Sequence, residues 1–206
     1  MLKIYGNMRS APCRKVRYIA EITETPYEWK ELDFRSGEMK SESYRLLHPA
    51  GKIPAIDDHG FTLFESEAIC KYLCEKSGHP LYPSELQLRA QVDQWRGFAW
   101  QHVGMAMNKV AFNRVLAPEF GIPVDERSLK EGLEWLERFL PIVDAQLSTM
   151  AFLVCDHMTL ADVVLLSVLD MAAPSGVDLA GFQDIQRWLN SMQELPAWKK
   201  FRDAAD

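Results

Sequence analysis

The chain lacks a long uninterrupted apolar run. The longest one, Val163–Leu169, is short and contains Ser167, whereas a membrane-spanning helix needs about 20 apolar residues. The first residues, Met1-Leu2-Lys3-Ile4, do not form the apolar stretch of a secretory signal. We therefore expect neither a membrane span nor a secreted protein, and we find no internal repeat and no low-complexity segment.

An excess of positive charge is also missing. The sequence holds 23 Lys and Arg against 29 Asp and Glu, a net charge of −6. Such a balance argues against an extended phosphate-binding surface, so nucleic acid is not an expected partner. Hydrophobic residues make up 48% and charged residues 25% of the 206 positions. These values are typical of a globular protein, which at this length needs no disulfides to stabilise its core.

Cysteine is scarce, with four residues at positions 13, 70, 74 and 155. Reduced thiols in the cytoplasm are the simplest interpretation. Cys70 and Cys74 share a helical spacing, but no further Cys or His stands near them at ligand spacing. We expect two buried thiols there and no metal site.

Residues 1–77 are expected to form one domain that contains both strands and helices. Alternating or aromatic-rich apolar stretches predict strands, and apolar residues at helical spacing predict helices. The expected strands are Leu2–Tyr5, Tyr27–Leu32, Pro54–Asp57 and Phe61–Phe64, and the expected helices are Pro12–Ile22, Ser41–Leu47 and Ser66–Lys76. The last two strands flank the turn Asp58-His59-Gly60 and form a hairpin. The predicted order is β-α-β-α-β-β-α.

A Gly- and Pro-containing linker at residues 78–84 ends this pattern, and strand signals stop after it. Residues 85–206 are expected to form an all-helical domain, which makes the fold α/β followed by all-α. A capping box of Ser84 and Gln87 is expected to begin a long helix towards Leu116. Further helices are expected at 125–147 with a kink at Pro141, at 159–171, at 182–191 and at 196–202.

The stretch Ser10-Ala11-Pro12-Cys13 places a hydroxyl and a thiol three residues apart where the first strand gives way to the first helix. Unpaired backbone N–H groups and the helix dipole stabilise an anion at such a position. Ser10 could donate a hydrogen bond to a bound thiolate and lower its pKa. The alternative is that Ser10 only caps the helix, because serine is a preferred N-cap residue.

Two further stretches place a charged residue beside backbone groups that could bind a ligand. In Gly51-Lys52-Ile53-Pro54-Ala55 a proline begins a strand, and Lys52 could neutralise a carboxylate or could be a solvated turn residue. In Glu65-Ser66 a serine precedes an apolar helix, whose N-terminus is an anion site, while Glu65 suits an ammonium group. Together they would fit an amino-acid head group. Thr159-Leu160-Ala161-Asp162, by contrast, resembles a capping box with a folding role.

Taken together, these residues resemble the cytosolic glutathione S-transferase family over nearly the whole chain. The resemblance is carried by the segments 10–14, 48–55, 65–69 and 159–162 in this order. Ser-x-Pro-Cys and Trp100-Gln101-His102 look most like theta-type bacterial members. The resemblance implies an N-terminal thioredoxin-like domain and a helical domain, glutathione as co-substrate, a detoxifying role, and a homodimer.

The resemblance also implies residue roles. Ser10 would hydrogen-bond the glutathione sulfur, and Ile53 would pair through its backbone before a cis-Pro54. Glu65 and Ser66 would hold the γ-glutamyl head. The chain has Met39 where theta-type members commonly carry His. Since Met39 cannot bind a carboxylate, the glycyl end would rely on Lys40 or Lys52.

A small hydrophobic electrophile would bind against the helical domain. Trp100 and Met105 are the candidate pocket residues, because aromatic and Met side chains suit a pliable apolar pocket. Both could instead serve the core or a dimer interface.

Three other functions stay open at this level. Ser10 is also compatible with a zeta-type glutathione-dependent isomerase, although that type has Ser-Ser-Cys in this loop. Cys13 could be the nucleophile of a thiol transferase. A non-catalytic binding module with this fold is the third alternative.

Overall fold

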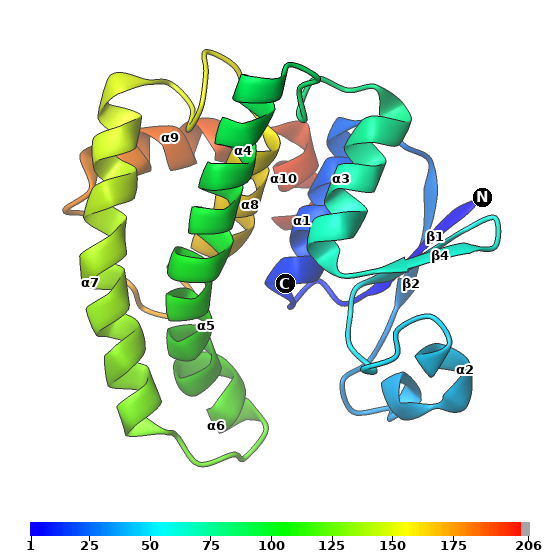
Figure 1. Cartoon of the computed structure of the whole chain (residues 1–206). Helices are drawn as coiled ribbons and strands as arrows, with labels where there is room; N and C mark the ends of the chain where they lie inside the picture. Colours follow the sequence, from blue (N-terminus) through cyan, green and yellow to red (C-terminus); the bar gives the residue numbers. More distant parts are fainter. Residues whose placement is uncertain (203–206) are drawn as a thin grey trace. The chain divides into compact units, whose positions relative to one another are not determined.

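The computed structural model describes residues 1–202, which divide into two compact units. The first unit contains residues 1–82 and the C-terminal segment that starts at Pro196, and the second contains residues 83–195. Figure 1 labels the α-helices and most of the strands.

The first unit mixes strands with helices. Its strands are β1 (Leu2–Gly6), β2 (Tyr27–Glu31), β3 (Ala55–Asp58) and β4 (Phe61–Phe64). Its helices are α1 (Ala11–Ile22), the 3-10 turn η1 (Glu38–Lys40), α2 (Glu42–Arg45), α3 (Ser66–Ser77) and α10 (Pro196–Arg202). The order β-α-β-α-β-β-α is confirmed. The helix expected at 41–47 is shorter, a single turn that Ser41 caps by accepting a hydrogen bond from Tyr44 N at 3.2 Å.

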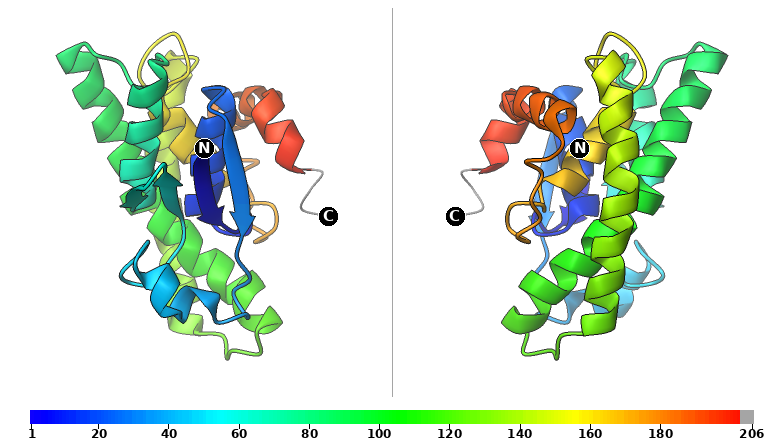
Figure 2. Two further views of the ribbon diagram at one scale, coloured as in Figure 1. Left: turned by 90° about the vertical axis from the view of Figure 1, so that its right-hand side faces the viewer. Right: turned by 90° about the vertical axis from the view of Figure 1, so that its left-hand side faces the viewer.

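The sheet has the strand order β2-β1-β3-β4. β1 pairs with β2 in parallel and with β3 in antiparallel orientation, so that Ile4 faces Trp29 on one side and Ile56 on the other. β3 and β4 form the expected hairpin. The left view of Figure 2 shows β1 and β2 side by side. This mixed sheet confirms the thioredoxin-like architecture.

Helices α1 and α3 contact each other and bury their apolar residues. Val16 and Ile19 of α1 and Ile69 of α3 are fully buried. A salt bridge between Lys15, whose side chain is 0% exposed, and Glu67 joins the two helices. A buried ammonium is costly without a partner, and Glu67 offsets that cost for Lys15.

Helix α10 packs on α1 and therefore belongs to the first unit in this division, whereas the sequence had grouped it with the helical domain. Lys200 Nζ lies 2.7 Å from Glu21 Oε2. The Arg17 guanidinium lies 4.0 Å from the ring centroid of Phe201 and 4.5 Å from that of Trp29. These contacts join residues far apart in the sequence, which local patterns do not reveal.

The second unit is all-helical, as expected. Its elements are α4 (Leu86–Phe98), the π-helical η2 (Ala99–Gly104), α5 (Met105–Ala111), the π-helical η3 (Phe112–Leu116), α6 (Ala117–Glu119), α7 (Glu126–Thr149), α8 (Leu160–Leu169) and α9 (Gln183–Gln193). One expected cap is wrong. Glu85, not Ser84, caps α4, because its carboxylate accepts from Gln87 N at 2.8 Å and from Leu88 N at 2.6 Å.

Helix α8 is the buried centre of this unit, since all ten of its residues are buried. The carboxylate of Asp162 accepts hydrogen bonds from Thr159 N at 2.9 Å, Leu153 N at 2.9 Å and Trp188 Nε1 at 3.1 Å. It therefore joins the start of α8 to the preceding loop and to α9. Within residues 1–202, no helix combines the length and the apolar character that crossing a bilayer requires.

Candidate functional site

The loop between β1 and α1 is organised by Asn7, a residue to which the sequence assigned no role. Its buried side chain donates to Leu32 O at 3.0 Å and accepts from Arg9 N at 3.0 Å. Its carbonyl accepts from Ser10 N at 3.0 Å. An Asn directly after a strand and ahead of a helix is the signal that could have found it. Asn7 thereby fixes the backbone that presents Ser10.

Ser10 occupies the N-cap position of α1, with φ −91° and ψ 118°. Its carbonyl accepts the first helical hydrogen bonds, from Cys13 N at 3.0 Å and from Arg14 N at 2.9 Å. Its side chain, however, makes no capping hydrogen bond. Ser10 is partly exposed and lies beside the N–H groups at the positive end of the α1 dipole, with its hydroxyl hydrogen-bonded to the Cys13 thiol rather than to the helix backbone.

Cys13 is packed inside the unit. The residue is 0% exposed, and a Cβ on Gly6 would lie only 2.9 Å from its sulfur. Burial raises the pKa of the Cys13 thiol to about 11, although a hydrogen bond with Ser10 acts in the opposite direction. The thiol is therefore neutral at physiological pH, and thiolate is the nucleophilic form. This argues against Cys13 as an attacking group.

The segment before β3 is held from the side of α2. The Ile53–Pro54 peptide bond is cis, the form that the resemblance implied. The buried Tyr44 donates its hydroxyl hydrogen to Lys52 O at 2.8 Å, and Ile53 packs against the cluster of Leu32, Tyr44 and Ala55. The backbone at Ile53 is consequently well positioned to meet an extended ligand.

The junction of β4 and α3 carries an unusual backbone conformation. Glu65 stands at the N-cap position of α3 with φ +68° and ψ 110°, a region that favours glycine. A non-glycine residue there costs free energy, and such residues cluster at functional sites. Ser66, the first residue of α3, is buried, and the Glu65 side chain is exposed. A carboxylate and a helix N-terminus thus lie next to each other.

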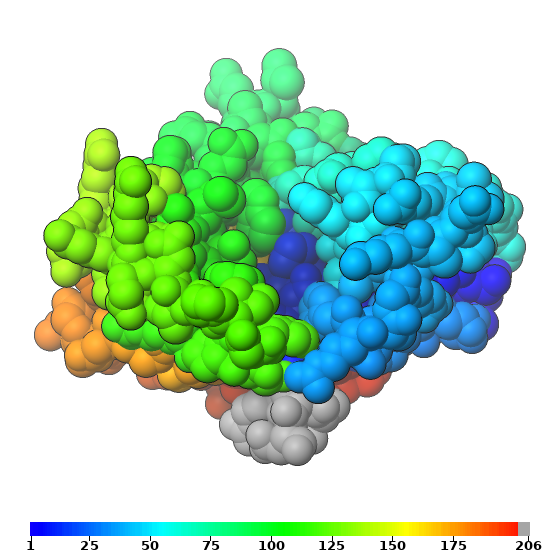
Figure 3. Space-filling model, turned by 90° about the horizontal axis from the view of Figure 1, so that it is seen from below, coloured from blue at the N-terminus to red at the C-terminus, as the bar shows by residue number. Residues whose placement is uncertain are grey.

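The two candidate lysines belong to adjoining segments. Gly51 has φ +61°, and a Cβ there would lie 2.6 Å from Met39 O. This close approach places Met39-Lys40 against Gly51-Lys52, with both lysines exposed. Figure 3 shows the segment of η1 and α2, in light blue, at the surface of the first unit. Met39 itself is partly buried and packs on the Leu32–Tyr44 cluster.

His48 is a further residue of this region, to which the sequence analysis assigned no role beyond its place in the segment 48–55. It is 3% exposed, and its ring lies 4.9 Å from that of Phe64. Burial lowers the pKa of His48, with Lys52 acting in the same direction and Glu65 against it. His48 is therefore a neutral residue at physiological pH, close enough to Glu65 and Lys52 for both charges to act on it.

Trp100 and Met105 lie in the second unit. Trp100 is half-buried in η2, where a Cβ on Gly104 would lie 3.4 Å from its ring. Met105 begins α5 and is 48% exposed. That Trp100 and Met105 line a pocket for an electrophile stays a prediction.

The first unit is thioredoxin-like, with Ser10 at the N-cap of its first helix, and a helical unit follows it. This combination is that of the cytosolic glutathione S-transferases. Residues 1–75 match the family model of the glutathione S-transferase N-terminal domain, and residues 105–196 match that of the C-terminal domain. Glutathione S-transferase theta-1 of Homo sapiens is 32% identical over 210 residues, which cover 99% of this chain and 83% of that protein. Glutathione S-transferase 1 of Zea mays is 29% identical over 202 residues, with 97% and 94% covered.

Solved structures agree with this. Glutathione transferase F2 from Populus trichocarpa has a TM-score of 0.93 at 29% identity, covering 99% of this chain and 98% of that one. The apo form of human glutathione S-transferase T1-1 has a TM-score of 0.87 at 31% identity, covering 100% and 87%. The chain belongs to the glutathione S-transferase family and is a transferase. The isomerase and the non-catalytic alternatives are not favoured by these similarities.

Proposed function

We propose that the first unit binds glutathione with its sulfur beside Ser10, whose hydroxyl donates a hydrogen bond to the thiolate. The observation that carries this proposal is the position of Ser10, which is partly exposed at the start of α1 and whose side chain makes no capping hydrogen bond. The adjacent Cys13 is buried and neutral. The reactive sulfur therefore arrives with the ligand, and the helix end and Ser10 lower its pKa.

The γ-glutamyl head binds at the start of α3. Its carboxylate meets the N-terminal N–H groups around Ser66, and its ammonium meets the exposed carboxylate of Glu65. The left-handed backbone of Glu65 supports this assignment, because strain of this kind is retained where a ligand benefits from it. The cysteinyl part pairs with the backbone of Ile53, ahead of the cis-Pro54.

The glycyl carboxylate lies between Lys40 and Lys52. Their segments adjoin where Met39 O approaches Gly51. Met39 contributes packing and leaves the charge to these two exposed lysines. Because exposed ion pairs are weak, this end adds modest affinity that declines with salt.

The second substrate is a small hydrophobic electrophile, which Trp100 and the exposed Met105 help to hold. The enzyme contributes mainly positioning and a lowered thiol pKa. A detoxifying role follows from a pocket that accepts many apolar partners.

The assembly is a homodimer located in the cytoplasm. Phe61 and Phe64 of β4 are 50% and 41% exposed, and a second copy would cover such apolar side chains. Sedimentation as a monomer at micromolar concentration would contradict the dimer. The acidic net charge of −6 gives no reason to expect nucleic acid or a membrane as a partner.

A Ser10→Ala variant tests the central role. We expect kcat/KM for conjugation of an aryl halide to fall about tenfold to a hundredfold, as for a lost hydrogen bond to a charged group. The apparent pKa of bound glutathione, read from thiolate absorption, should rise. The glutathione Kd measured by calorimetry should change little, because most of the tripeptide binds elsewhere. Ser77→Ala, at the far end of α3, is the matched control.

Two outcomes would contradict the proposal. Unchanged conjugation and unchanged thiol pKa in Ser10→Ala would remove Ser10 from the chemistry. Absence of glutathione binding by the wild-type protein at millimolar ligand would remove the site as a whole.

A further inference from the structure

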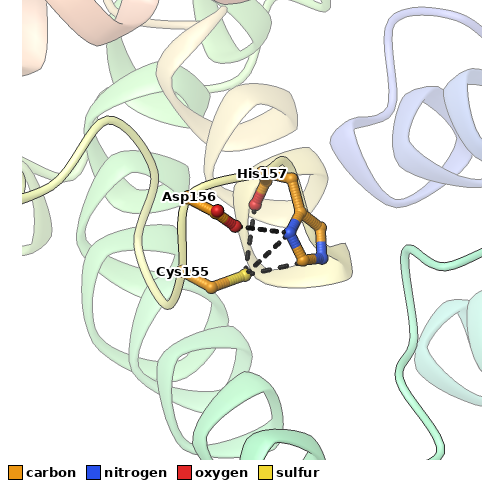
Figure 4. A group of neighbouring side chains, drawn as sticks. All are labelled: Cys155, Asp156 and His157. Carbon is orange, nitrogen blue, oxygen red and sulfur yellow. Dashed lines mark hydrogen bonds and ion pairs between the residues drawn. The ribbon is translucent and has the colours of Figure 1, made fainter.

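The loop between α7 and α8 carries three chemically unlike ligand groups in a row. Cys155, Asp156 and His157 converge, with their sulfur, carboxylate oxygen and ring nitrogen atoms within 4.8 Å of one another. Figure 4 shows the side chains turned towards one another rather than apart. Cys155 is half-buried, and the other two are exposed, so solvent and ions reach the cluster.

The distances between the side-chain atoms of the three residues suit the binding of one ion by all of them. His157 Nδ1 lies 2.8 Å from Asp156 Oδ1 and 3.6 Å from Cys155 Sγ. In a tetrahedral zinc site, with Zn–S about 2.3 Å and Zn–N about 2.0 Å, sulfur and nitrogen stand about 3.5 Å apart. The sulfur and nitrogen already have this spacing. Nitrogen and carboxylate oxygen would stand about 3.3 Å apart in the same geometry, so the carboxylate has to move about 0.5 Å away from the ring.

The loop is anchored on both sides of the cluster. Leu153 N and Thr159 N both donate to the buried carboxylate of Asp162, at 2.9 Å each. Leu153 O in turn accepts from Gln146 Nε2 at 2.8 Å. Since the two ends meet on one side chain, the intervening residues form a short fixed bulge. Such an anchored loop loses little conformational entropy when it binds an ion.

We propose that Cys155, Asp156 and His157 bind one divalent transition-metal ion, with Zn²⁺ as the best match. A thiolate and an imidazole are ligands that zinc prefers, whereas Mg²⁺ and Ca²⁺ require sets of oxygen atoms. Three protein ligands leave the fourth tetrahedral position to water. These three residues belong to the second unit, whereas the residues that we propose for glutathione belong to the first.

Binding has a defined proton balance. The Cys155 thiol loses its proton to solvent when sulfur coordinates Zn²⁺, His157 binds as the neutral imidazole, and Asp156 binds as the carboxylate. Affinity should therefore fall as the pH decreases. Occupancy should also shield the Cys155 sulfur from alkylating reagents.

The test is a titration of the full chain with Zn²⁺ in the absence of glutathione and of thiol reductants, which would compete for the ion. We expect one ion per chain, with Kd at least tenfold weaker in Cys155→Ser and in His157→Ala. Co²⁺ should produce a thiolate-to-metal charge-transfer absorption that Cys155→Ser abolishes. Alkylation of Cys155 by iodoacetamide should slow when Zn²⁺ is present.

His59→Ala is the matched control, because His59 is an exposed imidazole beside the Met1 amine, at 2.9 Å, and has no thiol partner. It should leave the titration unchanged. Binding that is equally tight in Cys155→Ser, or that is lost only in His59→Ala, would overturn the proposal. So would a cobalt complex without the charge-transfer band. Circular dichroism of each variant confirms that it is folded.

Discussion

Ser10 and Cys13 are three residues apart at the start of α1, yet only the serine reaches solvent. Ser10 is partly exposed, whereas Cys13 is 0% exposed, and a Cβ on Gly6 would lie 2.9 Å from its sulfur. One turn of helix thus separates the position that can meet a ligand from a position that packs the core.

The four cysteines should differ sharply in reactivity. Burial raises the pKa of Cys13 to about 11 and the pKa values of Cys70 and Cys74 to about 12. In metal-free buffer at neutral pH, iodoacetamide should label Cys155 first and leave the other three intact. Peptide mass spectrometry measures this directly, and Cys155→Ser should lose the fast phase. Labelling of Cys13 as fast as that of Cys155 would contradict the packing role of Cys13.

Asp162 should be one of the most sensitive positions of the second unit. Asp162→Ala leaves the buried donors of Leu153, Thr159 and Trp188 without their acceptor. We expect a loss of about 2–5 kcal/mol in the free energy of unfolding, measured by urea denaturation. Glu134→Gln, which removes an exposed pair with Lys130, should change it by less than about 0.5 kcal/mol.

Asp58 should make stability depend on acid pH. Its carboxylate pairs with Lys76 and accepts from Tyr72 Oη at 2.6 Å, and these hydrogen bonds lower the pKa of Asp58. A carboxylate with a lowered folded-state pKa stabilises the fold fully above its unfolded pKa of about 3.9. The contribution is lost as the pH falls through the folded-state value.

The difference in unfolding free energy between wild type and Asp58→Asn should consequently be constant from neutral pH to about pH 5 and shrink below about pH 4. Urea titrations at several pH values measure it. A difference that grows towards acid pH would show that the sign is wrong.

Arg17 should hold α10 on the first unit. Its guanidinium lies between the rings of Trp29 and Phe201, and its Nε donates to Tyr27 Oη at 3.0 Å. Arg17→Ala should lower the hydrogen-exchange protection of the α10 amides while α3 amides keep theirs. Lys3→Ala, at an exposed pair with Asp57, is the control. Unchanged protection of α10 would contradict the role of Arg17 and leave the docking to other contacts, such as Lys200–Glu21 and Tyr18–Phe201.

Local patterns predicted most of the fold. The turn Asp58-His59-Gly60 between two apolar stretches identified the β3–β4 hairpin, and helical spacing identified α1, α3, α7 and α8. The predicted N-cap of α4 was wrong by one residue, because the side chains of Ser84 and Glu85 can both accept hydrogen bonds from backbone N–H groups. In the structure Glu85 is the N-cap residue, because its longer side chain carries a carboxylate that accepts hydrogen bonds from two N–H groups.

The site could be predicted only in part. Ser10, Ile53, Glu65 and Ser66 stood in recognisable local patterns. The contacts of Asn7 and His48 could not be predicted from local patterns, because they involve Leu32, Phe64 and Glu65, which lie elsewhere in the sequence. The Cys155–His157 cluster likewise needed the loop conformation, since three adjacent side chains converge only when the backbone turns them to one side.

The sequence by itself determined the order of the elements and the chemical groups at the ends of α1 and α3, because spacing and capping are properties of neighbouring residues. Only the tertiary structure decided which of those groups meet water. Ser10 and Cys13 belong to the same helix start, but the packing of the unit buries the Cys13 sulfur, which lies close to Gly6, and leaves Ser10 partly exposed. Burial sets the pKa, and the pKa sets which group can take part in chemistry.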